Sequence, residues 1–236
     1  MDWNDYDAAL FDLDGVITPT AKVHEMAWGR MFTDFLVGHP GVAPYSDADY
    51  FAYVDGKPRY EGVASFLESR GIELPQGDPS DDPSAETVCA LGNRKNDYFS
   101  EVLRTDGVEA YPGSVALLDA LEKRGVKAAL VSSSRNARLV LEAAGMLDRF
   151  EVIIDGEVAA AEGIAGKPRP DTYEAAAERL GVPSNRSVVL EDAVSGVQAG
   201  AAGDFGLVVG VDRGAGADVL LENGADVVVS DLAELL

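Results

Sequence analysis

Short apolar runs alternate along most of the chain with segments whose apolar residues recur every three or four positions. Runs of the first kind are typical of buried strands, and segments of the second kind are typical of helices that pack on one face. Strands are predicted at residues 6–11, 126–131, 152–154, 188–190, 207–211 and 227–229, and helices at residues 114–124, 137–144, 172–180, 194–202 and 217–222. Strands that alternate with helices predict an α/β fold with a doubly wound, mainly parallel sheet.

The pattern changes between residues 20 and 104, where helical spacing continues without a strand pattern. Three apolar stripes indicate amphipathic helices there: Met26, Phe32, Phe35 and Leu36; Val63, Phe66 and Leu67; and Val88, Leu91, Tyr98, Phe99 and Leu103. The Pro- and Asp-rich stretch at 75–84 is predicted to be a surface loop. We therefore predict an α/β core of residues 1–19 and 105–236, interrupted by a helical domain of residues 20–104.

The charge balance narrows the classes of partner. The 236 residues include 41 Asp and Glu against 19 Lys and Arg, a formal charge of −22, which argues against a nucleic-acid partner and favours a monomer. Cys89 is the single cysteine and is expected in the core, so neither an intrachain disulfide nor a zinc site is predicted. The acidic start and the lack of an apolar run of about 18 residues predict no membrane partner and a cytoplasmic location.

Two carboxylates, Asp12 and Asp14, follow the first predicted strand, and Gly15 allows a sharp turn directly after them. Residues i and i+2 of a strand point to the same side, so both side chains would converge unless the backbone bends between them. Two such carboxylates repel each other unless a cation or a shared proton lies between them, and Mg²⁺ would meet that need. The alternative is a solvated Asp-x-Asp-Gly turn without a metal.

Three further predicted strand ends carry polar groups. The strand that ends at Val131 is followed by Ser132-Ser133-Ser134-Arg135-Asn136, whose hydroxyl and amide groups at a helix start suit an anion. Lys167 stands between Gly166 and Pro168, in a stretch that prolines stiffen. Glu191 and Asp192 end another strand. The carboxyl ends of parallel strands share one edge of the sheet, so these groups together predict phosphoryl transfer.

With these four motifs in order, the chain resembles the haloacid dehalogenase-like superfamily along nearly its whole length. The resemblance implies an aspartyl-phosphate on Asp12, with Asp14 as general acid and base. It implies that Ser132 and Lys167 hold the transferring phosphoryl group. Mg²⁺ is then expected on Asp12, the Asp14 carbonyl and Asp192, with Glu191 close by through water.

Within that superfamily the chain resembles the β-phosphoglucomutases, whose small helical cap lies between the first and second motifs. The resemblance implies substrate-binding roles for residues of the cap and the core: His24, Trp28, Arg59, Lys95, Asn96, Ser134, Arg135 and Asn136. Arg59 would grip the phosphate that is not transferred, because a guanidinium can make a bidentate contact. Pro19 departs from the pattern of these mutases, where an Asp is common, and is expected to stiffen the connection before the cap.

The resemblance implies conversion of a sugar phosphate, β-glucose 1-phosphate, to glucose 6-phosphate, primed by a 1,6-bisphosphate. The alternative on the same scaffold is a phosphatase, in which water takes the phosphoryl group from Asp12. A second alternative, from a different class, is a noncatalytic module that binds phosphosugars. The fate of the phosphate, retained on the sugar or released, separates the first two readings.

Overall fold

The computed structural model describes residues 1–236, which divide into two compact units. One unit, here called the core unit, comprises Met1–Thr20 and Val108–Leu236. The other, here called the helical unit, comprises Ala21–Gly107. The chain therefore leaves the core unit once and returns to it once.

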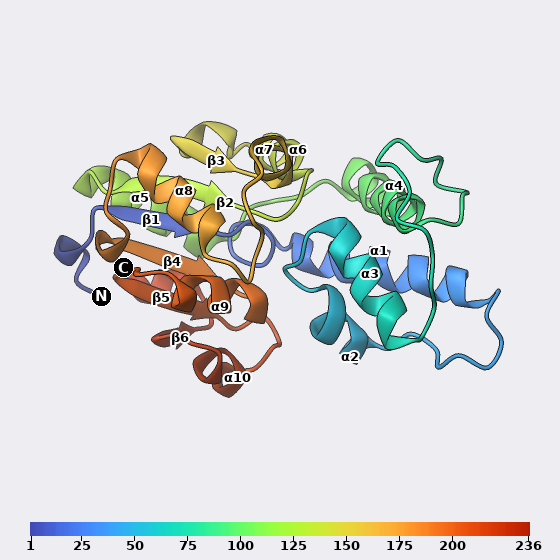
Figure 1. Cartoon of the computed structure of the whole chain (residues 1–236). Coiled ribbons are helices and arrows are strands. Elements are labelled where there is room, and N and C mark those ends of the chain that lie inside the picture. The colour runs from blue at the N-terminus through green and yellow to red at the C-terminus, as the bar shows by residue number, and fades with distance from the viewer. The chain divides into compact units, whose positions relative to one another are not determined.

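The core unit contains a sheet of six parallel strands in the order β3-β2-β1-β4-β5-β6 (Figure 1). The strands are β1 (Ala8–Phe11), β2 (Lys127–Val131), β3 (Val152–Ile154), β4 (Ser187–Glu191), β5 (Leu207–Val211) and β6 (Val227–Val229). The predicted doubly wound parallel sheet is thereby confirmed. The first strand begins at Ala8 instead of Tyr6, after the short 3₁₀ helix η1 (Trp3–Asp5).

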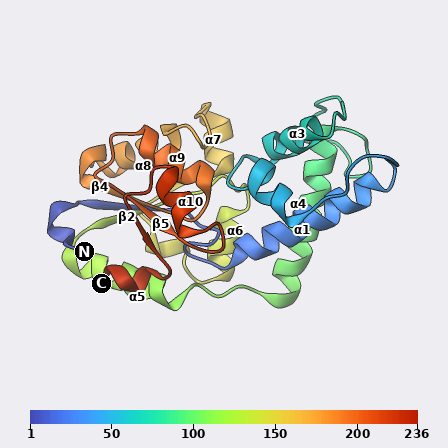
Figure 2. The ribbon, with the colours of Figure 1, turned by 90° about the horizontal axis from the view of Figure 1, so that it is seen from below.

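Helices cover both faces of this sheet. The longer ones are α5 (Pro112–Arg124), α8 (Asp171–Leu180) and α9 (Val194–Ala202). Helices α8 and α9 lie on one side of the sheet and α5 lies on the other (Figure 2). All four residues of β1 are buried, as expected for a central parallel strand with both faces covered.

The remaining elements of the core unit are short. They are α6 (Ala137–Ala143), α7 (Gly156–Glu162), α10 (Ala217–Glu222), and the 3₁₀ helices η3 (Leu147–Arg149), η4 (Ser184–Arg186) and η5 (Leu232–Leu235). The sequence did not predict α7, because none of its residues is buried and it lacks an apolar stripe. The Asp155 side chain caps this helix by accepting the N–H groups of Glu157 and Val158.

The helical unit contains no strand. Its elements are α1 (Thr20–Leu36, whose first residue belongs to the core unit), α2 (Asp47–Asp49), the π-helical turn η2 (Tyr50–Val54), α3 (Arg59–Ser69) and α4 (Val88–Asp106). Phe32 and Phe66 pack at the centre, with ring centroids 3.8 Å apart. The prediction that Met26 belongs to the apolar stripe of α1 was wrong, because its side chain is 58% exposed.

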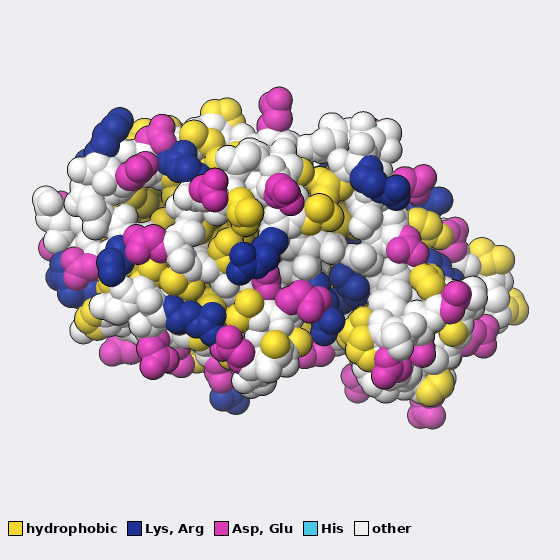
Figure 3. All heavy atoms as spheres, turned by 90° about the horizontal axis from the view of Figure 1, so that it is seen from above, with side chains coloured by type: hydrophobic (Ala, Val, Ile, Leu, Met, Phe, Trp, Pro, Cys, Tyr) yellow, Lys and Arg dark blue, Asp and Glu magenta, His cyan; other side chains and the backbone are white.

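The acidic composition of the chain is visible on its surface. Acidic side chains are spread over the face of the molecule in Figure 3, with Lys and Arg side chains among them.

No helix combines the length and the apolar character that crossing a membrane requires.

Candidate active site

The predicted site residues of the core unit gather where the sheet changes winding direction. Strand β1 lies between β2 and β4, and ligands of doubly wound sheets bind at the carboxyl ends of strands beside such a switch point. Asp12 follows β1 directly, and its backbone N–H donates to the Leu190 carbonyl of β4 at 2.9 Å. Glu191, the last residue of β4, and Asp192, which follows it, are thereby brought beside Asp12.

Lys167 joins two of these carboxylates. Its Nζ donates to Asp12 Oδ1 at 2.6 Å, to Glu191 Oε1 at 2.9 Å and to the Val131 carbonyl at 3.2 Å. The Lys167 side chain is only 2% exposed. A buried ammonium with three acceptors is held in one place, as binding a phosphoryl group requires.

Burial and charge act together on the protonation of this cluster. Burial raises the pKa of the Asp12 carboxyl well above its ordinary value, and the Glu191 carboxylate adds to the rise while Lys167 opposes it. Burial alone would lower the pKa of Lys167, but the carboxylates of Asp12 and Glu191 raise it well above its ordinary value. Lys167 is therefore positively charged throughout the physiological pH range.

Asp12, Glu191 and Asp192 fit a divalent cation. Each offers a carboxylate oxygen, and these oxygens lie within 4.8 Å of one another. Three carboxylates beside one ammonium leave two uncompensated negative charges, which a divalent ion would balance. Oxygen ligands are the kind that Mg²⁺ prefers. Glu191 already accepts hydrogen bonds on both oxygens, from Lys167 and from the Asp192 backbone N–H, so Asp12 and Asp192 are the better placed ligands.

Two glycines make room for these carboxylates. A Cβ on Gly15 would lie 1.8 Å from Asp192 Oδ2, and Gly15 has a φ of +89° that other residues rarely adopt. A Cβ on Gly196, the third residue of α9, would lie 1.4 Å from Glu191 Oε1. The sequence drew attention to Gly15 for its turn, but the space above Gly196 depends on how α9 packs against β4.

The Gly196→Ala substitution is expected to destabilise the protein, although Gly→Ala inside a helix ordinarily stabilises by about 1 kcal/mol. The added methyl group would push Glu191 away from Lys167 and leave a buried ammonium with one carboxylate fewer. We expect a loss of about 1–3 kcal/mol in the free energy of unfolding, measured by urea denaturation.

Gly38→Ala is the control for this substitution, because its Cβ would meet only the Phe35 carbonyl oxygen, at 3.6 Å. Its effect is expected to stay within about 0.5 kcal/mol. A Gly196→Ala protein as stable as the wild type would mean that Glu191 is not fixed in the position described.

The Asp14 side chain does not join the three clustered carboxylates. Strand β1 ends at Phe11 and the chain turns through Gly15, so the alternation of a strand no longer applies to Asp12 and Asp14. The Asp14 carboxylate accepts a hydrogen bond from the Thr20 hydroxyl. The Thr20 hydroxyl is in turn 2.7 Å from that of Thr18, and both threonines are buried.

The segment after β2 has the hydroxyl-rich form that the sequence predicts. Ser132 is buried, and its Oγ accepts the Ser134 backbone N–H at 3.1 Å. Ser134 Oγ in turn accepts the Asn136 N–H at 3.2 Å, just before α6 begins. The Arg135 guanidinium lies 3.4 Å from the Glu157 carboxylate. These residues lie at the same edge of the sheet as Asp12, because β1 and β2 are parallel neighbours and both segments follow the carboxyl ends of their strands.

The structure brings three of the predicted cap residues together inside the helical unit. The Lys95 ammonium is in hydrogen-bond contact with His24 Nδ1 and lies 5.0 Å from the centroid of the Trp28 ring. The Lys95 side chain is buried, and the His24 ring stacks on Phe99 with 4.1 Å between ring centroids. Helices α1 and α4 supply these groups.

Arg59 and Asn96 form a second group in the helical unit. Arg59 Nη2 donates to Asn96 Oδ1 at 2.8 Å. A Cβ on Gly92 of α4 would lie 2.7 Å from the Tyr60 ring and 3.1 Å from Arg59 Cδ, so the missing side chain lets α4 approach the start of α3. Asn96 follows Lys95 directly, so the two groups are adjacent along α4.

Sequence reasoning missed two neighbours of the catalytic candidates. The Thr20 hydroxyl donates a hydrogen bond to the Asp14 carboxylate. The centroid of the buried Tyr173 ring on α8 lies 5.0 Å from Lys167 Nζ. Burial raises the pKa of the Tyr173 phenol well above its ordinary value, and Glu191 adds to the rise. The position of Tyr173 on the buried face of a predicted helix could have drawn attention to it, but its contact with Lys167 required the fold.

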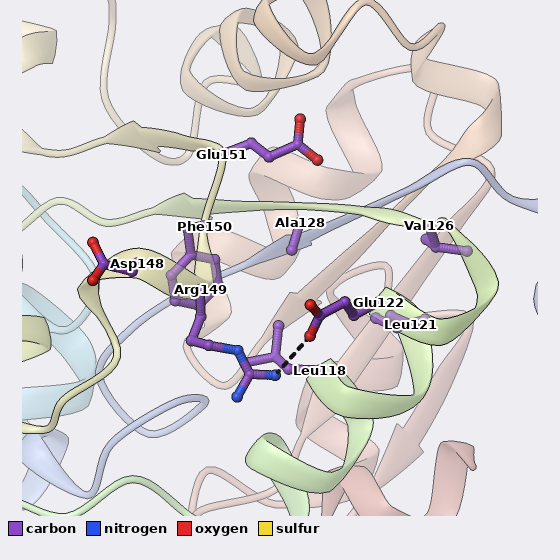
Figure 4. Close-up of a pocket in the computed structure, with 10 residues that line it drawn as sticks. Leu118, Leu121, Glu122, Val126, Ala128, Asp148, Arg149, Phe150 and Glu151 are labelled. Atoms are coloured by element: carbon purple, nitrogen blue, oxygen red, sulfur yellow. Dashed lines mark ion pairs between the residues drawn. The ribbon is translucent and has the colours of Figure 1, made fainter.

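A pocket of about 360 Å³ elsewhere in the core unit contains none of the predicted site residues (Figure 4). Val126 and Ala128 line it at the amino end of β2, whereas Ser132 follows the carboxyl end of that strand. Arg149 and Glu122 face each other across it as an ion pair of 3.8 Å. The carboxylate cluster around Asp12 therefore remains the candidate active site.

Comparisons with known proteins identify the family of the chain. The sequence model of the haloacid dehalogenase-like hydrolases matches residues 6–204. A curated β-phosphoglucomutase of Mycobacterium bovis is 51% identical over 97% of this chain and 91% of its own length, and one of Bacillus subtilis is 32% identical over 96% and 94%. The crystal structure of a β-phosphoglucomutase from Clostridium difficile has a TM-score of 0.77 at 27% identity, covering 98% of this chain and 93% of that one.

These matches span both the core unit and the helical unit, and they reach beyond the four polar motifs at the strand ends. A relative with half of its residues identical over nearly the whole chain places the sequence within one branch of its superfamily. The chain belongs to the haloacid dehalogenase-like hydrolases, in their β-phosphoglucomutase-like branch.

Proposed function

We propose that the protein is a β-phosphoglucomutase, which converts β-D-glucose 1-phosphate to D-glucose 6-phosphate through the 1,6-bisphosphate. The single observation that carries the proposal is the similarity to the mycobacterial enzyme of that name along nearly the whole chain. The cluster of Asp12, Lys167 and Asp192 supports it, because it supplies the groups that phosphoryl transfer requires.

Asp12 is the nucleophile in this proposal. A carboxylate oxygen attacks the phosphorus of the bisphosphate, and the bond from that phosphorus to the sugar oxygen breaks. The hydrogen bond from Lys167 to Asp12 Oδ1 orients the carboxylate and favours its ionised form. In the second half of the reaction a hydroxyl of glucose 1-phosphate takes the phosphoryl group, which restores the Asp12 carboxylate.

Asp14 carries the proton in both halves. It protonates the sugar oxygen that leaves in the first half and takes the proton of the attacking hydroxyl in the second. The hydrogen bond from Thr20 holds the Asp14 carboxylate in the orientation described above.

Ser132 and Lys167 hold the transferring phosphoryl group. The Lys167 ammonium faces the oxygen atoms of Asp12 and would offset negative charge that develops beside them. Mg²⁺, held by Asp12, Asp192 and the Asp14 carbonyl, would supply further neutralisation of charge on the phosphoryl oxygens. We propose that Arg59 binds the phosphate that is not transferred, and that His24, Trp28, Lys95, Asn96, Ser134, Arg135 and Asn136 contribute to binding of the sugar phosphate.

The experiment that tests this proposal follows two products at once. The purified protein is incubated with Mg²⁺, β-glucose 1-phosphate and a trace of glucose 1,6-bisphosphate, and glucose 6-phosphate and inorganic phosphate are measured together. Glucose 6-phosphate is expected to form much faster than inorganic phosphate. Stoichiometric release of phosphate without isomerisation would make the protein a phosphatase, as the alternative reading of the sequence predicts.

Mg²⁺ is expected to stabilise the folded protein, independently of turnover. A ligand that binds only the folded state adds about 2.7 kcal/mol at 100 times its Kd, so a thermal unfolding titration in chelator-treated buffer should show a rising midpoint. The Asp192→Asn protein should lose most of this rise, because it removes one of the clustered carboxylates.

The exposed Asp218 supplies the matched control for that titration, since Asp218→Asn changes the net charge equally. It should respond to Mg²⁺ as the wild type does. An unfolding midpoint that does not depend on Mg²⁺ in the wild type would contradict a metal site at Asp12, Glu191 and Asp192.

A further inference from the structure

Three consecutive carbonyls in the turn after Asp14 accept hydrogen bonds from three separate donors. The Gly15 carbonyl accepts from Arg213 Nε at 2.7 Å. The Val16 carbonyl accepts from the Ser114 hydroxyl at 2.6 Å, and the Ile17 carbonyl accepts from the Tyr111 backbone N–H at 2.9 Å. The turn that presents Asp14 is thus fixed from outside at each of these peptides.

Arg213 is the one charged donor among the three, and it is itself held on several sides. It stands two residues after β5, and its Nη1 donates to the Ser230 carbonyl at 2.9 Å. Its guanidinium carbon lies 4.0 Å from the centroid of the Tyr111 ring. A planar guanidinium that stacks on a ring and donates along two edges has little freedom to move.

The backbone around Arg213 is also braced. Asp212 Oδ1 accepts the N–H groups of Gly214 at 2.9 Å and Gly216 at 3.1 Å, which shapes the loop between β5 and α10. The Asp212 N–H donates to the Val229 carbonyl of β6 at 2.8 Å. Arg213 therefore connects the carboxyl ends of β5 and β6 to the turn at Gly15 through hydrogen bonds.

Gly15 is a sensitive place for such a contact. It follows Asp14 directly, and its Cα packs so closely on Asp192 that even a methyl group would collide with that carboxylate. A shift of the Gly15 peptide would change the direction in which the Asp14 side chain extends from the backbone. A misplacement of about 1 Å in a reacting group can cost roughly 10²-fold in rate.

We propose that Arg213 is a positioning residue for proton transfer, which acts on Asp14 through the Gly15 carbonyl. The proposal rests on the proposed role of Asp14 as general acid and base. Arg213 touches neither Asp12 nor Lys167 in the contacts described, so it should affect the proton transfer more than the attack by Asp12.

The two steps can be separated by the choice of phosphoryl donor. A sugar oxygen leaves as a poor leaving group and needs a proton from Asp14, whereas p-nitrophenolate leaves without one. The burst of p-nitrophenolate in the first turnover of p-nitrophenyl phosphate therefore measures attack by Asp12 alone. Steady-state turnover of the sugar phosphate measures both steps.

The experiment compares Arg213→Gln, Arg213→Lys and the wild type by both measurements. Arg213→Gln is expected to lower kcat on the sugar phosphate by about 10- to 100-fold, with KM and the burst rate constant changed less than about 3-fold. Arg213→Lys should show the same pattern with a smaller loss, because it keeps the charge without the planar fork. It also serves as the test if the Gln variant does not fold.

In an Asp14→Asn background, Arg213→Gln should cost less than about 2-fold, because the group that it positions is already gone. Arg186→Gln is the matched control, since Arg186 pairs with Asp7 on the exposed surface, and both rates should be unchanged. Equal losses in burst and turnover, or full additivity with Asp14→Asn, would overturn the proposal. A wild-type protein that gives a burst but releases phosphate without forming glucose 6-phosphate would instead overturn the mutase assignment alone.

Discussion

The Asp12→Asn protein is expected to fold normally and to lose at least about 10⁴-fold of its turnover of β-glucose 1-phosphate. An amide oxygen can still accept the hydrogen bond that Lys167 donates to Asp12 Oδ1, so the packing around the site should persist. An amide cannot attack phosphorus to form an acyl phosphate, so the covalent path is closed. Intact-protein mass spectrometry after mixing with the bisphosphate should show a phosphorylated wild type and an unmodified variant.

Asp148→Asn is a suitable control for the loss of one carboxylate, because Asp148 is exposed at the pocket of Figure 4 and does not belong to the carboxylate cluster. Its turnover and its phosphorylation should match the wild type. If Asp12→Asn kept a turnover within about tenfold of the wild type, Asp12 could not be the nucleophile, and a different phosphoryl acceptor would have to be sought.

The fold of the core unit was predictable because its strands are buried on both faces. Each apolar run, such as the one that ends at Phe11, is apolar at every position, which is typical of a strand that is buried on both faces. The amphipathic helices predicted between the runs are the elements that can cover those faces. The residues directly after the runs at β1 and β4 are then fixed at one edge of a parallel sheet. The convergence of Asp12 with Glu191 and Asp192 follows from that logic alone.

The orientation of Asp14 could not be predicted in the same way. It depends on a turn through Gly15 whose peptides are held by Arg213, Ser114 and Tyr111, all of them about 100 or more positions away along the chain. A local sequence pattern around Asp14 contains no information about hydrogen-bond donors so far away along the chain. The space that Gly196 leaves for Glu191 was hidden for the same reason, since it depends on the packing of α9 against β4.

In the helical unit, the spacing of apolar residues predicted helices, but it did not indicate which residues would form a binding site. Met26 continues the apolar spacing of α1, yet it is exposed, because spacing cannot say how wide the buried face is. The pairing of Lys95 with His24 and of Arg59 with Asn96 joins α4 to α1 and α3, which no local pattern specifies. The binding roles of these residues come from resemblance, and they remain predictions.

The Lys167→Met substitution is expected to lower the free energy of unfolding by about 3–5 kcal/mol near neutral pH, in buffer without divalent metal. Methionine fills a similar volume, so the loss reports charge: two buried carboxylates, Asp12 and Glu191, would face each other without the ammonium that both now contact. Lys22→Met is the control, since Lys22 pairs with Glu25 on the surface with its side chain 71% exposed, and it should cost less than about 1 kcal/mol.

The pH dependence identifies the cause of this loss. The raised pKa of Lys167 means that its contribution to stability is fully present below the ordinary lysine pKa and disappears only as pH rises through the raised value. In Lys167→Met the pKa of Asp12, already raised by burial and by Glu191, should rise further, so the folded protein binds a proton more readily than the unfolded chain. The stability deficit, measured by urea unfolding, should therefore shrink as pH falls from about 8 to about 5. A deficit that stays constant over this interval would assign the loss to packing, and the electrostatic role of Lys167 in holding the two carboxylates together would have to be abandoned.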